Sequence, residues 1–522
     1  TSESLRAERI CQIPRLSVAV AATEMDLHES FTNIDWLVVF GYLALTTAVG
    51  HFLRGKQASV KDFFLGGRSL PWPAVSGSII ATEISGVTFI GVPGMVYAAQ
   101  GNFTYLQWGI GSIIARVIVG FFFVRAFYER EIYSPYDYMG RRIKPQLKTL
   151  ATVFFTIGSI LAQSVRVLVA ALPLMIVTGL SFEVCIFIIG VFAIGWTLMG
   201  GMRTVIWTDV IQSIVLLVGA VAIAVILLVN HPGGAGEAMQ VAAGAGKFSL
   251  GSYAIDFTQS TFWVVLIYGV FINLNNFGID QSFVQRYHTA RDDQAAARSV
   301  WTGALLYVPV AALFFFIGSM LFSYYEASPH LLAELKAAHP DGHADQVLPH
   351  FIATQLPPGV AGLLIAAIFA AAMSSIDTSL NSSATVTLKD FVQRYLKRGE
   401  DEEGALRILR GATLLWGVLG TGVALAMLGQ KSLLDSWWKL SGIFAGGMLG
   451  LFLLGLISRK ADNAGALTGV ILGVLIICWM TFTDYFPEEF RSPFHAHMII
   501  VIGTMTIFLT GIGISRWRPS GG

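Results

Sequence analysis

Charged residues are scarce in this chain of 522 residues. Lysine, arginine, aspartate and glutamate together make up 13% of it, whereas a soluble domain contains about 25%. The 34 basic and 33 acidic residues leave a net charge of +1, which argues against a nucleic-acid-binding protein. Cysteine is rarer still, and the three cysteines lie too far apart to form a metal-binding or redox motif.

The motifs of common soluble enzymes are also missing. The chain has no HExxH metalloprotease motif, no phosphate-binding P-loop and no GxSxG nucleophile elbow. Its ten histidines lie in or beside polar connections and in the N-terminal tail, without the spacing of a metal site. The sequence therefore predicts neither an enzyme nor a resident organic cofactor.

Long apolar segments fill most of the chain instead. Hydrophobic residues make up 54% of the sequence, and the mean hydropathy is +0.65. Because about 20 apolar residues cross a bilayer as a helix, we expect an all-α polytopic membrane protein with about 13 transmembrane helices. The expected helices cover roughly residues 34–52, 73–98, 104–127, 149–177, 182–199, 205–229, 260–279, 300–324, 359–388, 406–428, 432–457, 464–483 and 495–514.

The remaining segments are polar. Residues 1–33 are expected to form an N-terminal tail that precedes a membrane domain of residues 34–522. Two long polar connections are expected at 230–259 and 325–358.

The distribution of basic residues predicts the orientation of the chain. With the N-terminus outside, 24 basic residues fall in connections on the cytoplasmic side and only four in those outside. Three more in the tail weakly oppose this assignment. Because cytoplasmic loops carry the excess of lysine and arginine, the bias predicts a plasma (inner) membrane protein with a cytoplasmic C-terminus.

A few charged residues fall inside the expected helices, where each costs about 2.5–3.5 kcal/mol unless it is paired or functional. These residues are Glu83, Arg116, Arg166, Asp209, Asp377, Asp435 and Lys439. Asp435 and Lys439 are four residues apart on one helix and are expected to pair with each other. Arg116 is expected to pair structurally or to reach toward the interface.

The helix over 359–388 carries a stripe of hydroxyl groups around one carboxylate. Ser374, Asp377 and Thr378 share one helical face, and Ser375 and Ser379 lie on the adjoining face. Hard oxygen ligands suit a hard cation such as Na⁺, so the stripe predicts a cation site. The alternative is a packing face of small residues whose hydroxyls bond to their own helix.

The helix over 73–98 is interrupted by Gly86, Gly91, Pro93 and Gly94. Such interruptions in an apolar segment indicate a broken helix, whose freed carbonyl groups can coordinate a cation. A proline kink that binds nothing is the alternative.

These two segments, together with residues 62–72, 200–212 and 285–287, resemble the sodium:solute symporter family. The resemblance covers nearly the whole chain beyond residue 33. It implies a LeuT-like fold with two inverted five-helix repeats, here about 73–229 and 260–457, and alternating access to a site near the middle of the membrane.

The resemblance also implies sodium sites. The expected ligands of the principal site are the carbonyl oxygens of Ala81, Ile84 and Ala371 and the hydroxyls of Ser374 and Ser375. Members that bind a second sodium ion use positions that correspond to Asp209, Ser374, Asp377 and Thr378. Several members carry serine or threonine in place of Asp377, and two carboxylates at one cation either bind it more strongly or leave one protonated.

Members that carry galactose or sialic acid indicate where a solute would bind. The matching positions are Glu83, Ser85, Thr88, Gln107, Arg166 and Asn273. Asn276 replaces an aromatic inner gate. In the helix over 432–457, Trp438 is expected either to stack on a sugar ring or to anchor the interface, and its neighbour Lys439 is a further solute candidate.

The pairing of Arg166 decides the chemistry of that solute. If Arg166 and Glu83 pair, the site is neutral and suits a hydroxyl-rich sugar. If Arg166 faces the solute, it can hold a carboxylate bidentately, which favours a sugar acid or another carboxylate. The expected function is sodium-coupled symport of a sugar or sugar acid. The alternatives are a symporter of monocarboxylate or vitamin-type anions and a non-transporting membrane sensor of the same fold.

Overall fold

The computed structural model describes residues 31–55, 59–129, 134–142, 145–178, 180–338, 344–399, 401–428, 447–458 and 461–517. Within these ranges the chain is helical and has no strand, only an isolated bridge between Leu70 and Ala290. The helices are α2 (Asn33–Leu53), α3 (Val60–Leu65), α4 (Trp72–Glu83), α5 (Gly86–Tyr97), α6 (Gln107–Ile118), α7 (Arg125–Glu129), α8 (Pro135–Arg142), α9 (Pro145–Thr178), α10 (Phe182–Val229), α11 (Gly234–Gly244), α12 (Phe262–Gly278), α13 (Gln281–Tyr287), α14 (Asp293–Glu326), α15 (Pro329–Ala338), α16 (Val347–Gln355), α17 (Val360–Val386), α18 (Glu402–Ala426), α20 (Asn463–Thr481) and α21 (Met498–Trp517).

Most of the expected spans are present. In the described ranges, ten helices are long and apolar enough to cross a membrane, and up to twelve if each of two bent pairs counts as one span. The remaining expected span, over 432–457, is described only in part, as the short apolar helix Gly447–Ile457. Residues 1–30 of the expected tail also lie outside the described ranges.

Two spans are broken in the middle. The chain bends by 54° between α4 and α5, which confirms the broken helix expected over 73–98, and by 64° between α12 and α13. Ser85 caps α5 by accepting from the Thr88 backbone N–H at 3.4 Å. Asp280 caps α13 by accepting from the Ser282 backbone N–H at 2.7 Å. Because an N-cap side chain satisfies a backbone donor, each break can begin a new helix.

The two spans expected over 182–199 and 205–229 meet inside α10 at Gly201. Gly201 has φ +53°, and a Cβ there would lie 2.5 Å from the Phe63 carbonyl oxygen. A glycine is therefore required, because any side chain would collide with the segment that precedes α4.

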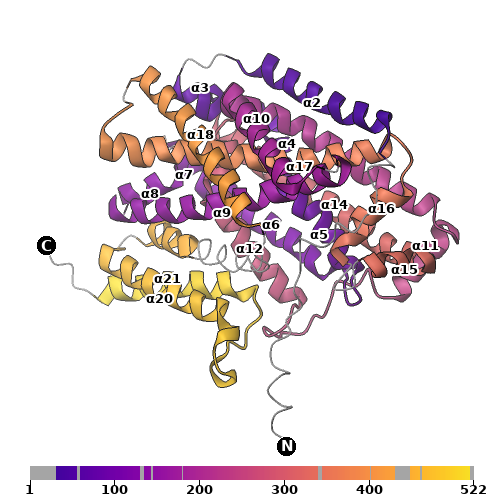
Figure 1. The fold of residues 1–522 in the computed structure, drawn as a ribbon. Coiled ribbons are helices and arrows are strands. Elements are labelled where there is room, and N and C mark those ends of the chain that lie inside the picture. Colours follow the sequence, from indigo (N-terminus) through magenta and orange to yellow (C-terminus); the bar gives the residue numbers. More distant parts are fainter. Residues whose placement is uncertain are drawn as a thin grey trace, which may run out of the picture.

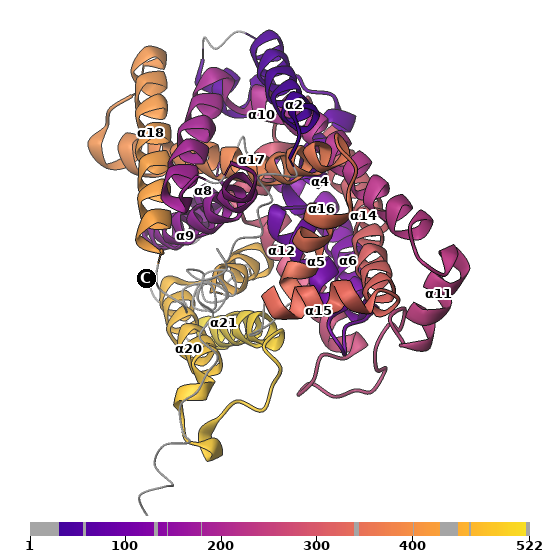
Figure 2. The ribbon, with the colours of Figure 1, turned by 45° about the vertical axis from the view of Figure 1, so that its right-hand side comes forward.

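Helix α17, which carries the hydroxyl stripe, lies at the centre of the molecule (Figures 1 and 2). It contacts α2, α4, α9, α10 and α18. Most of its residues are buried, whereas in the other unbroken spans of the described chain at most half are. Its many alanines and serines let the neighbouring backbones approach closely.

The two long connections are partly helical. Helices α11, α15 and α16 gather with α5 at one end of the molecule (Figure 1). Lys247, which follows α11, is fully buried and donates to the carbonyl oxygens of Val96 and Tyr97 at 2.9 and 3.1 Å. Burial lowers the pKa of Lys247. This cation caps the C-terminal end of α5, where the helix dipole is negative.

Hydrogen bonds of Asp35 connect helix α2 to the N-terminal end of α17. Its Oδ1 accepts from the backbone N–H groups of Gly359 and Gly362, both at 2.7 Å. Asp35 is fully buried, and its negative charge lies at the N-terminal end of α17, where the helix dipole is positive. Helix α2 is therefore a structural part of the domain that holds α17 in place.

We expect Asp35→Ala to lower the free energy of unfolding by about 3 kcal/mol, because two buried N–H groups lose a charged acceptor. The melting temperature of the purified protein measures this. Asp256→Ala is the matched control, since the partly exposed Asp256 also accepts two hydrogen bonds, both from Thr258. Equal effects of the two substitutions would contradict the role of Asp35.

Candidate functional site

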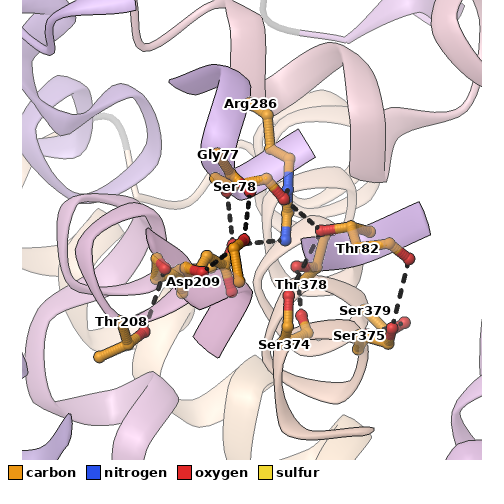
Figure 3. A network of polar contacts seen from close by, with 12 residues as sticks. Gly77, Ser78, Thr82, Thr208, Asp209, Arg286, Ser374, Ser375, Thr378 and Ser379 are labelled. Carbon is orange, nitrogen blue, oxygen red and sulfur yellow. Dashed lines mark hydrogen bonds and ion pairs between the residues drawn. The ribbon is translucent and has the colours of Figure 1, made fainter. Parts of the chain in front are cut away.

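A buried ion pair joins three helices near the middle of the bundle (Figure 3). Asp209 in α10 accepts from Arg286 Nη2 in α13 at 2.8 Å and from Ser78 Oγ in α4 at 2.5 Å. Arg286 Nε also donates to the Ser78 carbonyl oxygen at 3.3 Å. All three side chains are buried, and Arg286 lies in the second half of the bent span formed by α12 and α13.

The pair leaves one carboxylate oxygen unused. Asp209 Oδ1 is buried and has no hydrogen-bond partner in the described part of the chain. An oxygen in this position can serve as a cation ligand, because it carries negative charge and its desolvation is otherwise uncompensated.

The hydroxyl stripe of α17 faces the end of α4 (Figure 3). Ser374 Oγ lies 3.4 Å from Thr82 Oγ1, and Ser375 Oγ donates to the Ala371 carbonyl oxygen at 3.3 Å and to that of Thr82 at 3.5 Å. Thr378 Oγ1 donates to the Ser374 carbonyl oxygen at 2.7 Å. The bonds of Ser375 and Thr378 to carbonyl groups of α17 itself match the packing alternative, but each uses only the hydroxyl proton. The oxygen lone pairs remain able to accept a cation.

The end of α4 supplies carbonyl groups at the same place. Because α4 ends at Glu83, its last carbonyl groups lack the partners that a continuous helix would provide. Ala81 and Ile84 are both buried there, across from Ser374 and Ser375. The structure thus brings together the two segments expected to form the principal sodium site.

Asp377 lies at the edge of this arrangement. Its Oδ1 accepts from Thr197 Oγ1 in the first half of α10 at 3.1 Å. Its place in a second sodium site with Asp209, Ser374 and Thr378 stays a prediction.

Glu83 pairs with Arg116 of α6, not with Arg166. The two side chains are 3% and 0% exposed, and the Arg116 guanidinium lies 3.8 Å from the centre of the Phe277 ring at the end of α12. This outcome matches the structural pairing expected for Arg116. It excludes the neutral Glu83–Arg166 pair as the state of this structure.

Arg166 in α9 is left without an ion pair in the described ranges. Its Nη1 donates to the Ser375 carbonyl oxygen at 3.3 Å and to the Ser379 hydroxyl. Asp280 interacts with its charge from a greater distance. A partly buried guanidinium beside the hydroxyl stripe is a suitable binding group for an anion.

The other expected solute residues have different environments. Gln107 is buried, and its Nε2 has no partner in the described chain. Thr88 Oγ1 donates to the Glu83 carbonyl oxygen at 3.4 Å. Asn273 accepts from Ser112 at 2.9 Å and donates to the Gly269 carbonyl oxygen at 2.8 Å, so it already serves the packing of α12 on α6.

Asn276 Oδ1 accepts a long hydrogen bond of 3.5 Å from Asn275 Nδ2. Trp438, Asp435 and Lys439 lie outside the described residues. A cavity of about 10 Å³, room for about one water molecule, lies beside Thr88, Tyr105 and Tyr307.

The three short motifs over residues 62–72, 200–212 and 285–287 lie close together in the structure. Gln285 Nε2 donates to the Phe64 carbonyl oxygen at 2.9 Å, and the Leu70 backbone N–H donates to Thr289 at 3.1 Å. Gly66 and Gly201 lie against Arg203 and Phe63, respectively. Burial lowers the pKa of the neighbouring His288 to about 3, so this imidazole is neutral at pH 7. The three motifs thus pack against one another.

Comparisons with known proteins agree with this arrangement. A model of the sodium:solute symporter family matches residues 63–473. The sodium/sialic acid symporter NanT of Aliivibrio fischeri is 33% identical over 481 residues, covering 92% of this chain and 94% of that protein. The sodium-coupled monocarboxylate transporter 2 of Mus musculus is 28% identical over 481 residues, covering 89% of this chain and 75% of the relative.

Solved structures show the same fold. A sodium-coupled sialic acid symporter in a substrate-bound, outward-open state has a TM-score of 0.84 at 30% identity, covering 94% of this chain and 99% of that one. The nucleobase-cation-symport-1 transporter Mhp1 has a TM-score of 0.57 at 17% identity, covering 87% and 94% of the two chains, and shares the fold alone. This chain belongs to the sodium:solute symporter family and has the expected LeuT-like fold.

We expect Asp209→Asn to destabilise the protein by about 3–5 kcal/mol, because Arg286 would remain as an unpaired buried charge. Adding Arg286→Gln should restore part of this loss in a double-mutant cycle of melting temperatures. The exposed Arg125–Glu129 pair is the control, and its disruption should cost less than about 1 kcal/mol. Additive effects at Asp209 and Arg286 would show that the pair does not act as a unit.

Proposed function

We propose that this chain is a secondary active symporter that imports a small polar solute together with sodium, and that the solute is a sugar acid. One observation carries the choice of an acid: Arg166 forms no ion pair in the described chain, whereas Glu83 is neutralised by Arg116. The relatives that transport sialic acid, which is a sugar acid, support the same solute class.

Sodium is proposed to bind between the end of α4 and the stripe of α17. Carbonyl groups of Ala81, Ile84 and Ala371 and the hydroxyls of Ser374 and Ser375 would hold the ion. Their oxygens suit Na⁺, and binding would fasten the broken helix to the central helix.

The contact between Arg166 and Ser375 suggests how ion and solute are coupled. Arg166 Nη1 donates to the carbonyl oxygen of a residue whose hydroxyl is a sodium ligand in this proposal. A carboxylate held by Arg166 would therefore lie near the sodium ion. Opposite charges attract strongly in a site with little water, so each would raise the affinity of the other.

A second sodium ion is proposed beside Asp209 Oδ1, with the hydroxyls of Ser374 and Thr378 and the carboxylate of Asp377. Arg286 compensates the negative charge of Asp209, and a monovalent cation would compensate the negative charge of Asp377. Each ion that moves through 100 mV contributes about 2.3 kcal/mol, so two ions would accumulate solute more steeply than one.

We also propose that the protein lies in the plasma (inner) membrane, with its N-terminus outside and its C-terminus in the cytoplasm. The excess of basic residues in alternate connections supports this orientation. We further propose that the membrane domain consists of two inverted repeats, about 73–229 and 260–457. We propose a role in transport without catalytic activity.

A second candidate is a symporter of monocarboxylates or vitamin-type anions. Arg166 would hold any carboxylate, and monocarboxylate and multivitamin transporters are among the relatives. A sensor of the same fold would bind the solute without moving it.

We expect sodium-driven uptake of a sugar acid into proteoliposomes, and Ser374→Ala with Ser375→Ala should raise the sodium concentration for half-maximal uptake about tenfold, because two ion ligands are lost. Ser383→Ala is the control, since Ser383 lies on the same helix but bonds to Ser159. Uptake that is indifferent to sodium would refute the proposal.

We expect Arg166→Gln to weaken solute binding about 10- to 100-fold, because it removes the charged donor for the carboxylate. Isothermal titration with sialic acid and with pyruvate, each in sodium and in potassium, measures this. Unchanged affinity for both anions would remove Arg166 from the site, and binding without uptake would favour the sensor.

A further inference from the structure

The Glu83–Arg116 pair keeps part of its hydrogen-bonding capacity unused. Glu83 Oε2 and Arg116 Nε and Nη1 are buried, and none has a hydrogen-bond partner in the part of the chain that the structure describes. A purely structural pair would be expected to satisfy these atoms, because unsatisfied buried polar groups are costly. Two donors and one acceptor are therefore available at one place.

This place lies between the two helix breaks. Glu83 is the last residue of α4, and the Arg116 guanidinium lies over Phe277 in the last turn of α12. In transporters of this fold, the solute binds where the broken helices meet. The position of the pair is thus that of a solute-binding group.

Helix α14 packs closely against the pair. A Cβ added at Gly303 would lie only 3.2 Å from Arg116 Nη1, so the glycine lets α14 approach without placing a side chain against that donor. Tyr307, one turn further along, interacts electrostatically with both charges and also lines the small cavity beside Thr88. The pair and the cavity therefore have Tyr307 as a common neighbour.

The pair and Arg166 approach the same break through different neighbours. Arg166 donates to the Ser375 carbonyl oxygen, and Ser375 donates to the carbonyl oxygen of Thr82, the residue before Glu83. Arg166 of α9 is thus connected to the end of α4 through Ser375. Arg116 of α6 contacts the same end directly through Glu83. A solute at the break would have a cationic group at one end and a neutral, strongly polar pair at the other.

We propose that Arg116 and Glu83 form a second subsite that recognises hydroxyl groups of the solute. A sugar hydroxyl can accept from Arg116 and donate to Glu83 at the same time, which would satisfy two of the unused atoms with one group. The pair adds no net charge, so it does not oppose the carboxylate held by Arg166. The inference rests on the proposed function and deepens it, because it selects hydroxylated acids over plain monocarboxylates.

The wild-type protein tests this directly with sialic acid and with analogues that lack one hydroxyl each. At least one deoxy analogue should bind about tenfold or more weakly, since a site built for a hydroxyl leaves its polar groups unpaired without it. If no single hydroxyl changes the affinity more than threefold, the subsite does not exist.

The double variant Glu83→Gln with Arg116→Gln then locates the effect. It removes both charges together, so no unpaired charge remains. It should bind sialic acid and the sensitive analogue with nearly equal, weakened affinity, while pyruvate binding and its sodium dependence persist. Trp301→Phe is the control, because it removes only a hydrogen bond to the Arg116 carbonyl oxygen and should keep the hydroxyl preference.

The two proposals fail in different ways. If the wild type binds no anion in a sodium-dependent manner, the proposed function fails. If it binds sialic acid with sodium and the double variant keeps the full hydroxyl preference, only the subsite fails. If the double variant does not fold, Glu83→Gln alone must reduce that preference, and an unchanged preference overturns the subsite.

Discussion

The buried pair of Asp209 and Arg286 is the interaction on which the arrangement of this transporter depends. It joins the first half of a broken span, the second half of another and the long helix α10, and Ser78 binds both partners. In an apolar interior neither charge is stable alone, so the three helices are held in one relative position. That position places the end of α4 against α17, where the sodium ligands are proposed.

The other charged residues of the expected membrane spans differ in whether they are paired. Glu83 and Arg116 neutralise each other at the break, whereas Arg166 keeps its charge available beside the hydroxyl stripe. In the proposed site an anion held by Arg166 would not be opposed by Glu83, because Arg116 neutralises that carboxylate. The net charge of +1 therefore does not describe the local charge around Arg166, because charges of opposite sign pair at other positions.

Much of the fold could be predicted because local pattern determines it. Apolar length gives the spans, and the glycines and proline after Glu83 indicate the first break. The second break occurs at Ile279 and Asp280, where Gly278 ends α12 and the aspartate caps α13, and these two signals lie at the end of the apolar segment rather than inside it. Arg286 lies beyond the apolar segment over 260–279, and hydropathy cannot tell a buried cation from one in solvent.

The sequence by itself determined the membrane class, most of the helices and the stripe of hydroxyl groups, because each depends on composition or on spacing along one helix. The family followed from the resemblance of several motifs. The tertiary structure alone decided which charges pair. Glu83 had two basic candidates, Arg116 and Arg166, and the packing of α6 against the break selected the first. Ion pairs between helices depend on distances across the fold, and no periodicity within a helix encodes them.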